Sequence, residues 1–210
     1  MSKIDEIREL IMKGKGKQIA AAVEEAIKAG EDANKLLNEG MIGAMDEIGA
    51  KFTEGKIFVP EMLVSAKAMK KGVEALKPHL SSDAAAGLGT VVIGTVLGDL
   101  HDIGKNLVAM MLESAGFEVI DLGVDVSPEK YLETAKANPN TKIICCSALL
   151  TTTMPNIGAT VKAFKDAGMN DIKIMIGGAP VTQKYCDEIG ADAYTADAAA
   201  AAAKAKELVA

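Results

Sequence analysis

Apolar residues recur at three- and four-residue steps through the first third of the chain, a spacing typical of amphipathic helices. In the first two segments these positions are Ile4, Ile7, Leu10, Ile11, Ile19, Val23 and Ile27. Glycine-containing or polar breaks fall at residues 14–16, 30–32 and 53–56. A last segment opens near Pro60, a residue suited to the first turn of a helix. Residues 1–77 therefore predict four helices joined by short loops, a small helix bundle.

A different pattern follows residues 78–87, a stretch with Pro, Ser and Ala that is typical of a linker. Short runs rich in β-branched residues then alternate with helical segments. The expected strands cover residues 90–96, 118–121, 142–146, 172–176 and, with a weaker pattern, 191–195; the expected helices cover residues 105–115, 128–137, 154–167, 181–189 and 196–208. This alternation predicts an α/β fold with a doubly wound, five-stranded parallel sheet of the Rossmann or flavodoxin kind. We expect a helical domain over residues 1–86 and a sheet domain over residues 87–210.

Composition and charge narrow the function classes. The 210 residues carry a net charge of −6, which argues against a nucleic-acid partner because no basic face is available to displace counterions. No apolar run approaches the roughly 20 residues that a membrane helix needs, and the first residues do not resemble a secretion signal. Three cysteines, two of them adjacent, cannot form a disulfide framework. We therefore expect a cytoplasmic protein that binds neither nucleic acid nor membrane.

Small and polar residues follow three of the expected strands, at the sheet edge where ligands bind in α/β folds. The first strand is followed by residues 98–106 (GDLHDIGKN), the third by residues 147–153 (SALLTTT) and the fourth by residues 177–180 (GGAP). Taken singly, these loops also fit a turn at the glycine pair and a helix cap at the hydroxyl residues.

His101 is one of only two histidines, and it lies between two aspartates in the first of these loops. A carboxylate partner fixes the tautomer of an imidazole and aims its other nitrogen, as in many metal ligands. A bare ion would need three or four protein ligands, and no second His, Cys pair or acidic cluster is close in sequence. A lone His ligand therefore fits a metal held in a macrocycle; the alternative is a His that hydrogen-bonds its own loop.

The three loops also form one ordered pattern: Asp99-x-His101-x-x-Gly104, then Ser147-x-Leu149, then Gly177-Gly178. This pattern resembles the cobalamin-binding domain shared by cobalamin-dependent methionine synthase, certain mutases and corrinoid methyl-carrier proteins. Residues 98–106 look most like the methyl-transferring branch. Residues 55–61 (GKIFVPE) and 67–70 (KAMK) look like the four-helix cap that precedes the cobalamin domain in such carriers. The resemblance covers nearly the whole chain.

The resemblance implies base-off binding of cobalamin, with the nucleotide tail of the cofactor buried at the strand ends. His101 would be the lower axial ligand of cobalt, Asp99 would hold this His, and Thr153 would continue the hydrogen-bond relay where methionine synthase has Ser. Further residues implied to contact the cofactor are Gly98, Leu100, Asp102, Ile103, Gly104, Ser147, Leu149, Thr151, Gly177, Gly178 and Ala198. In the cap, Phe52, Val59 and Met62 match positions that shield the upper face of the corrin, although their spacing alone favours ordinary bundle core.

By this resemblance the protein is a corrinoid protein that is not catalytic alone. It would carry a methyl group on cobalt, as methylcobalamin, cob(I)alamin and cob(II)alamin in turn. A substrate:corrinoid methyltransferase would supply the methyl from methanol, a methylamine, a methylated thiol or a quaternary amine. A second methyltransferase would pass it to coenzyme M or tetrahydrofolate, and a reductive activase would be a third partner. Residues 78–89 would be the hinge on which the cap swings aside.

Three alternatives stay open at this point. A cobalamin subunit of a radical mutase would share the loop around His101, but the cap-like helical half of this chain argues against it. A cobalamin-dependent sensor would need an output domain. A receiver-type signalling domain would share the sheet but needs clustered acids and a later Lys that this pattern only half supplies. The sequence names neither the methyl donor nor the oligomeric state.

Overall fold

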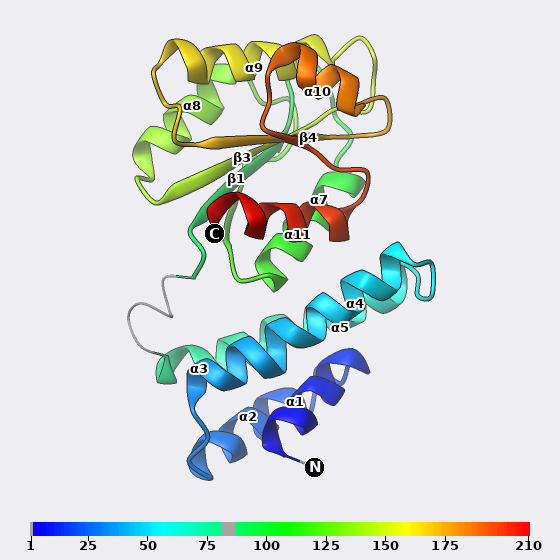
Figure 1. Ribbon diagram of the computed structural model, residues 1–210, viewed down its shortest axis with the longest axis vertical. Helices are drawn as coiled ribbons and strands as arrows, with labels where there is room; N and C mark the ends of the chain where they lie inside the picture. Colours follow the sequence, from blue (N-terminus) through cyan, green and yellow to red (C-terminus); the bar gives the residue numbers. More distant parts are fainter. Residues whose placement is uncertain (1, 81–86) are drawn as a thin grey trace. The chain divides into compact units, whose positions relative to one another are not determined.

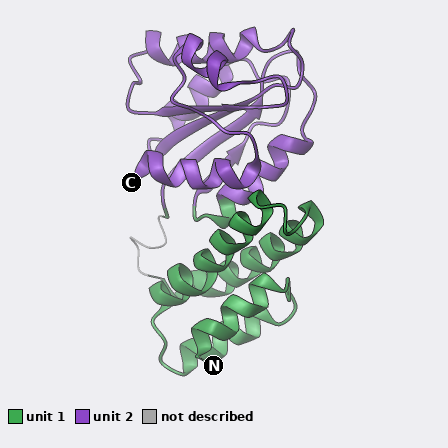
Figure 2. Ribbon diagram, turned by 45° about the vertical axis from the view of Figure 1, so that its right-hand side comes forward, with its two compact units in different colours: residues 1–87, 113–116 green, residues 88–112, 117–210 purple. Residues whose placement is uncertain are grey.

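The computed structural model describes residues 2–80 and 87–210. The chain forms two compact units, one of residues 1–87 with 113–116 and one of residues 88–112 with 117–210 (Figure 2). The expected domain boundary after residue 86, and the centre of the expected hinge, lie outside the described residues.

The first unit is a helix bundle. Its helices are α1 (Lys3–Met12), α2 (Ile19–Lys28), α3 (Ala33–Lys35), the π-helical η1 (Leu36–Ile42), α4 (Gly43–Thr53), α5 (Val59–Leu76) and the short 3₁₀ helix η2 (Lys77–His79). Pro60 lies in the first turn of α5, as expected, and α3, η1 and α4 follow one another without a break. The predicted third helix therefore exists, but the sequence pattern did not reveal its π-helical segment.

Buried apolar side chains from all the long helices fill the bundle, among them Ile7, Ile11, Ile19, Met41, Met69 and Leu76. Gly72 of α5 allows a close helix contact, because a Cβ there would lie 3.1 Å from Ile19 and 3.2 Å from Met41. Of the periodic positions read from the sequence, Ile7, Ile11, Ile19 and Val23 are buried in the bundle core, while Ile4, Leu10 and Ile27 are half-buried.

The second unit is the predicted α/β sheet. Its strands are β1 (Thr90–Thr95), β2 (Glu118–Asp121), β3 (Thr141–Ser147), β4 (Lys173–Gly177) and β5 (Ala193–Tyr194). All pair in parallel in the order β2-β1-β3-β4-β5, which confirms the doubly wound plan. The order reverses between β1 and β3, so the loops after these two strands lie side by side at the carboxyl edge.

Helices cover both faces of the sheet (Figure 1): α8 (Pro128–Ala137), α9 (Pro155–Asp166) and α10 (Gln183–Ile189) on one, α7 (Ile103–Ser114) and α11 (Ala198–Val209) on the other. Residues Val92, Ile144, Cys146 and Phe164 are buried in the core beneath the first group. Burial raises the pKa of the Cys146 thiol to about 12, so this cysteine packs as an apolar residue. Among residues 2–80 and 87–210, no helix combines the length and apolar character needed to cross a bilayer.

Candidate functional site

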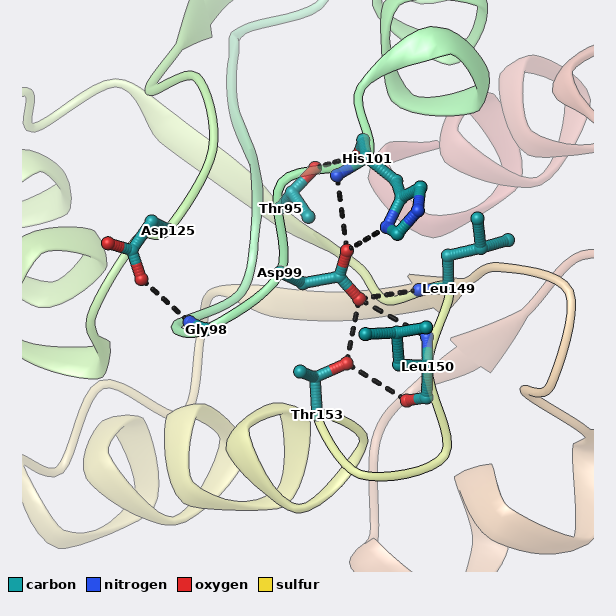
Figure 3. Close-up of polar contacts among 8 residues, drawn as sticks. All are labelled: Thr95, Gly98, Asp99, His101, Asp125, Leu149, Leu150 and Thr153. Atoms are coloured by element: carbon teal, nitrogen blue, oxygen red, sulfur yellow. Dashed lines mark hydrogen bonds and ion pairs between the residues drawn. The ribbon is translucent and has the colours of Figure 1, made fainter.

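A buried carboxylate, that of Asp99, joins the loops after β1 and β3 (Figure 3). Its Oδ2 accepts hydrogen bonds from the backbone N–H of Leu149 at 2.8 Å and of Leu150 at 3.2 Å. The hydroxyl of Thr153 lies 2.7 Å from the same oxygen. The loops that the sequence pattern singled out after the first and third strands therefore meet on one side chain.

The other oxygen of Asp99 holds His101. Oδ1 lies 2.7 Å from Nδ1 of the imidazole and accepts the backbone N–H of His101 at 3.1 Å. An ionised carboxylate only accepts, so Nδ1 carries the ring proton and Nε2 keeps a free lone pair. The His101 side chain is 51% exposed, and Figure 3 shows its outer ring edge turned away from Asp99. This is the geometry of an imidazole prepared to bind a metal through Nε2.

The charge on Asp99 is maintained by its hydrogen bonds. Burial alone raises the pKa of a carboxyl group, but the contacts from Thr153, His101 and Leu149 outweigh burial and hold the pKa of Asp99 well below its usual range. Asp99 is therefore an anion at neutral pH, fixed beneath the imidazole.

The backbone around His101 has its own supports. The buried hydroxyl of Thr95, at the end of β1, donates to the carbonyl oxygen of His101 at 2.8 Å. The amide of Asn156 donates to the carbonyl of Leu97 at 2.7 Å. Asp125, in the loop after β2, contacts both Gly98 and Asp99. The sequence analysis did not identify Thr95, Asn156 or Asp125, because nothing local marks a residue whose partner is on another loop.

Apolar side chains stand exposed around the imidazole. Ile103 is 87% exposed and Leu100 70%, and Leu97, Leu149 and Leu150 are exposed in the same loops. Large aliphatic groups seldom gather in water without a partner, so this edge of the sheet fits an apolar, extended ligand.

Two glycines of the pattern have different structural reasons. Gly178 has φ +125°, and a Cβ there would lie 1.9 Å from the carbonyl oxygen of Ala148. The loops after β3 and β4 thus require glycine at this position for the fold itself. At Gly104, in the first turn of α7, a Cβ would meet no atom within 4 Å. The protein alone does not require Gly104 to lack a side chain, and the open space above it faces solvent next to His101.

The remaining predicted contact residues are distributed as follows. Ser147 is the last residue of β3, Gly177 is the last residue of β4 and Ala198 is the first residue of α11. Thr151 is exposed in the turn after β3. Asp102 is exposed and accepts a hydrogen bond from Asn106 at 3.1 Å. In the bundle, Met62 is completely buried, Phe52 is half-buried and Val59 is exposed. Cofactor contact by these residues stays a prediction.

A buried cation next to the site was also not anticipated. Lys105 follows Gly104 on α7, its side chain is 1% exposed, and its Nζ lies 2.6 Å from Oδ1 of Asp121 and 2.6 Å from the side-chain oxygen of Asn106. Asp121 also accepts the backbone N–H of Gly123 at 2.8 Å. This ion pair ties the start of α7 to the end of β2. Over the part of the chain that the structure describes, no group of three or more His, Cys, Asp or Glu side chains is placed to hold an ion.

Each of the two units matches a known protein family. Residues 89–204 match a family described as the B12 binding domain, and residues 3–77 match a second family of the same description. The chain is 44% identical to dimethylamine corrinoid protein 1 of Methanosarcina acetivorans, over 100% of both chains. It is 45% identical to trimethylamine corrinoid protein 2 of Methanosarcina mazei, over 90% of this chain and 88% of the relative.

Two solved structures are also similar. The methanol:cobalamin methyltransferase complex MtaBC of Methanosarcina barkeri contains a chain with a TM-score of 0.86 and 31% identity, covering 99% of this chain and 79% of that one. A cobalamin-binding protein of Desulfitobacterium hafniense has a TM-score of 0.83 and 29% identity, over 99% of this chain and 98% of its own.

Proposed function

Because this chain belongs to the methyl-carrying corrinoid proteins with B12-binding domains, we propose that His101 is the lower axial ligand of the cobalt in its bound corrinoid. The observation that carries the proposal is the 2.7 Å contact between Nδ1 of His101 and the buried carboxylate of Asp99. That contact leaves Nε2 as the free donor on a half-exposed ring. A corrin already supplies four nitrogen ligands, so a single protein nitrogen is sufficient.

The surroundings of the imidazole fit a corrin. Exposed Leu100, Ile103 and Leu149 offer apolar surface to a broad macrocycle, and Gly104 leaves room for close approach. We propose that the displaced nucleotide tail lies along Ser147, Thr151 and Gly177-Gly178, which are at or just after the carboxyl ends of β3 and β4. This is base-off binding, in which the side chain of the protein replaces the cofactor's own lower base.

The bound corrinoid supplies the cobalt centre that accepts and gives up the methyl group. The chain supplies control of the axial nitrogen. Asp99 keeps the proton on Nδ1, which directs the Nε2 lone pair outward. If His101 left the metal, the hydrogen bond from Nδ1 to Asp99 would keep the free imidazole in the same orientation. Thr153 holds the second oxygen of Asp99 and so sets how strongly the carboxylate interacts with the ring.

The methyl donor that we propose is a methylated amine, the substrate class in the names of relatives with 44% and 45% identity. A substrate:corrinoid methyltransferase would load the cobalt, a second methyltransferase would pass the methyl to coenzyme M or tetrahydrofolate, and a reductive activase would restore cobalt after oxidation. Phe52, Val59 and Met62 of the helical unit would shield the methyl group between its loading onto cobalt and its transfer to the acceptor.

Axial ligation can be tested with the two histidines of the chain. Protein labelled with ¹⁵N-histidine is loaded with hydroxocobalamin and reduced to cobalt(II), and its electron paramagnetic resonance spectrum is compared with that of the ¹⁴N protein. Ligation by His101 predicts that each cobalt hyperfine line splits into three with ¹⁴N and into two with ¹⁵N. The benzimidazole of the cofactor is unlabelled and would give three lines in either protein, so the two-line pattern of the ¹⁵N protein is specific for histidine. The ¹⁵N-labelled His101→Ala protein should bind the corrinoid and lose the two-line pattern, whereas His79→Ala should retain it. A labelled wild type without the two-line pattern, or a labelled His101→Ala that keeps it, would contradict the assignment.

The donor class has a separate test. The loaded, reduced protein is incubated with dimethylamine, trimethylamine or methanol methyltransferase from Methanosarcina and the matching ¹⁴C-methyl substrate. We expect label on the protein with an amine enzyme and not with the methanol enzyme. Label only with the methanol enzyme would replace the amine with an alcohol as donor and leave the axial-ligand assignment intact.

A further inference from the structure

Asp125 has an unusual backbone conformation close to the site. Within residues 2–80 and 87–210 it is the only residue other than glycine with a positive φ, at +56°. It lies in the loop between β2 and α8, and it is exposed to solvent. The left-handed conformation is unfavourable for residues with a Cβ, and aspartate and asparagine tolerate it best. A strained position in a loop next to a binding site needs a physical reason.

The contacts of Asp125 supply that reason. Its carboxylate oxygen Oδ1 accepts the backbone N–H of Gly98 at 2.7 Å. Its own backbone N–H donates to the carbonyl oxygen of Asp99 at 3.0 Å. The two bonds run in opposite directions and enclose the Gly98–Asp99 dipeptide from one side, as Figure 3 shows for the side-chain bond. The left-handed turn allows one residue to make both bonds, and glycine at this position would make only the second.

The enclosed dipeptide carries the residue that orients the imidazole. The side chain of Asp99 is fixed from the loop after β3, by Leu149, Leu150 and Thr153. Its backbone is fixed from the loop after β2, by Asp125. Gly98 has φ +79°, so this part of the chain has little conformational restraint of its own. Without the Asp125 carboxylate the Gly98–Asp99 segment would lose the hydrogen bond at the N–H of Gly98 and keep only the one at the carbonyl oxygen of Asp99.

We propose that Asp125 is a positioning residue for the axial ligand. By bonding to both Gly98 and Asp99 it holds the Asp99 carboxylate under His101 and keeps the imidazole in one orientation. It touches neither the imidazole nor the free Nε2 position. The inference deepens the proposed function and rests on His101 being the cobalt ligand, while the bond to Gly98 is a property of the protein alone.

The first test measures the bond to Gly98 in the corrinoid-free protein. Asp125→Gly relieves the backbone strain and removes the acceptor, whereas Asp125→Asn tolerates the turn and keeps an amide oxygen. Asp171→Gly, which removes an exposed loop aspartate at the opposite end of β4, is the control. By NMR we expect the Gly98 amide to exchange with solvent about three- to tenfold faster in Asp125→Gly and to stay within about twofold of wild type in the other two. Unchanged exchange in Asp125→Gly would overturn the inference.

The second test measures ligation in the protein loaded with hydroxocobalamin and reduced to cobalt(II). The proteins are labelled with ¹⁵N-histidine, so that only an axial histidine gives a two-line nitrogen splitting. The ratio of cobalt without to cobalt with this two-line splitting should rise about three- to tenfold in Asp125→Gly, while Asp125→Asn and Asp171→Gly resemble wild type. A ratio equal to wild type in Asp125→Gly would overturn the positioning role and leave the proposed function standing. Labelled wild-type protein without the two-line splitting would instead overturn the proposed ligation, and the positioning role with it.

Discussion

The hydroxyl oxygen of Thr153 lies 2.7 Å from Oδ2 of Asp99 and 2.9 Å from the carbonyl oxygen of Leu150. A hydroxyl has one proton, so Thr153 can donate to only one of these two acceptors at a time. The anionic carboxylate is the stronger acceptor, and we assign the proton to Asp99. The side-chain hydrogen bond from Thr153 to the carboxylate beneath His101 therefore uses the one proton of a buried hydroxyl group.

Removing this hydroxyl should destabilise the corrinoid-free protein. Thr153→Val keeps the shape of the side chain but leaves the buried Asp99 carboxylate with one donor fewer, at an expected cost of about 1.5–3 kcal/mol. Thr153→Ser keeps the donor and should recover most of the loss. Urea unfolding of the three proteins measures the effect. A Thr153→Val protein that unfolds at the wild-type midpoint would show that the hydroxyl does not stabilise the carboxylate.

Gly104 separates the needs of the fold from those of the ligand. A Cβ at this position meets no atom, and alanine favours helix over glycine, so Gly104→Ala should raise the stability of the corrinoid-free protein by about 0.5 kcal/mol. The same methyl group would enter the space that we assign to the corrin, and affinity for hydroxocobalamin should fall at least about tenfold. Thermal melts and a spectral titration measure the two effects. Unchanged affinity would place the macrocycle away from α7.

Gly178 should show the opposite behaviour. A Cβ there would overlap the carbonyl oxygen of Ala148, and φ is +125°, so Gly178→Ala should destabilise the corrinoid-free protein by about 2–4 kcal/mol. Gly177→Ala is the matched control, because its Cβ would lie 3.5 Å from the nearest oxygen, that of Thr195. Its cost should stay below about 1 kcal/mol. Equal melting temperatures for the two variants would disagree with the close contact between the loops.

The ion pair between the buried Lys105 and the exposed Asp121 gives an asymmetric prediction. Asp121→Asn leaves the Lys105 ammonium buried without its countercharge, and because Asp121 is partly solvated we expect a cost of about 2 kcal/mol rather than that of a fully buried pair. Lys105→Met removes the buried charge and fills the same volume, so we expect a smaller loss of about 1 kcal/mol or less. Chemical unfolding of both variants measures the difference. If Lys105→Met lost more stability than Asp121→Asn, the hydrogen bonds of the ammonium group would stabilise the fold by more than the burial of its charge costs.

The pKa of Asp99 predicts how stability depends on pH. A carboxyl group whose pKa is lower in the folded than in the unfolded protein stabilises the fold fully above its unfolded pKa, about 3.9. That contribution declines as the pH falls below this value toward the folded pKa. The stability advantage of wild type over Asp99→Asn should therefore shrink below pH 4 by up to about 1.4 kcal/mol per pH unit.

Calorimetry of the corrinoid-free proteins from pH 6 to pH 3 measures this advantage. Above pH 5 the difference between wild type and Asp99→Asn should not depend on the ionisation of Asp99. Parallel stability curves for the two proteins below pH 4 would show that the contacts around Asp99 do not favour its charged form.

Much of the fold follows from short-range patterns. Periodicities of about 3.6 and alternation of strand with helix predicted the bundle and the five-stranded sheet, and the structure confirms both. Boundaries differ by up to two residues: α7 begins at Ile103 rather than at Lys105, and β5 is shortened to Ala193–Tyr194. The π-helical η1 was not predicted, because its residues have the same spacing as an ordinary helix.

The sequence by itself determined which loops carry the chemistry: Asp99 and His101 are two positions apart, so their contact is local and can be read from the chain. The tertiary structure alone decided what holds that contact in place. Thr153 and Asp125 are 54 and 26 positions from Asp99, and only the reversal of strand order beside β1 brings their loops to it. A hydrogen bond acts over about 3 Å, whereas a sequence pattern records only neighbours along the chain, so such partners become visible only after folding.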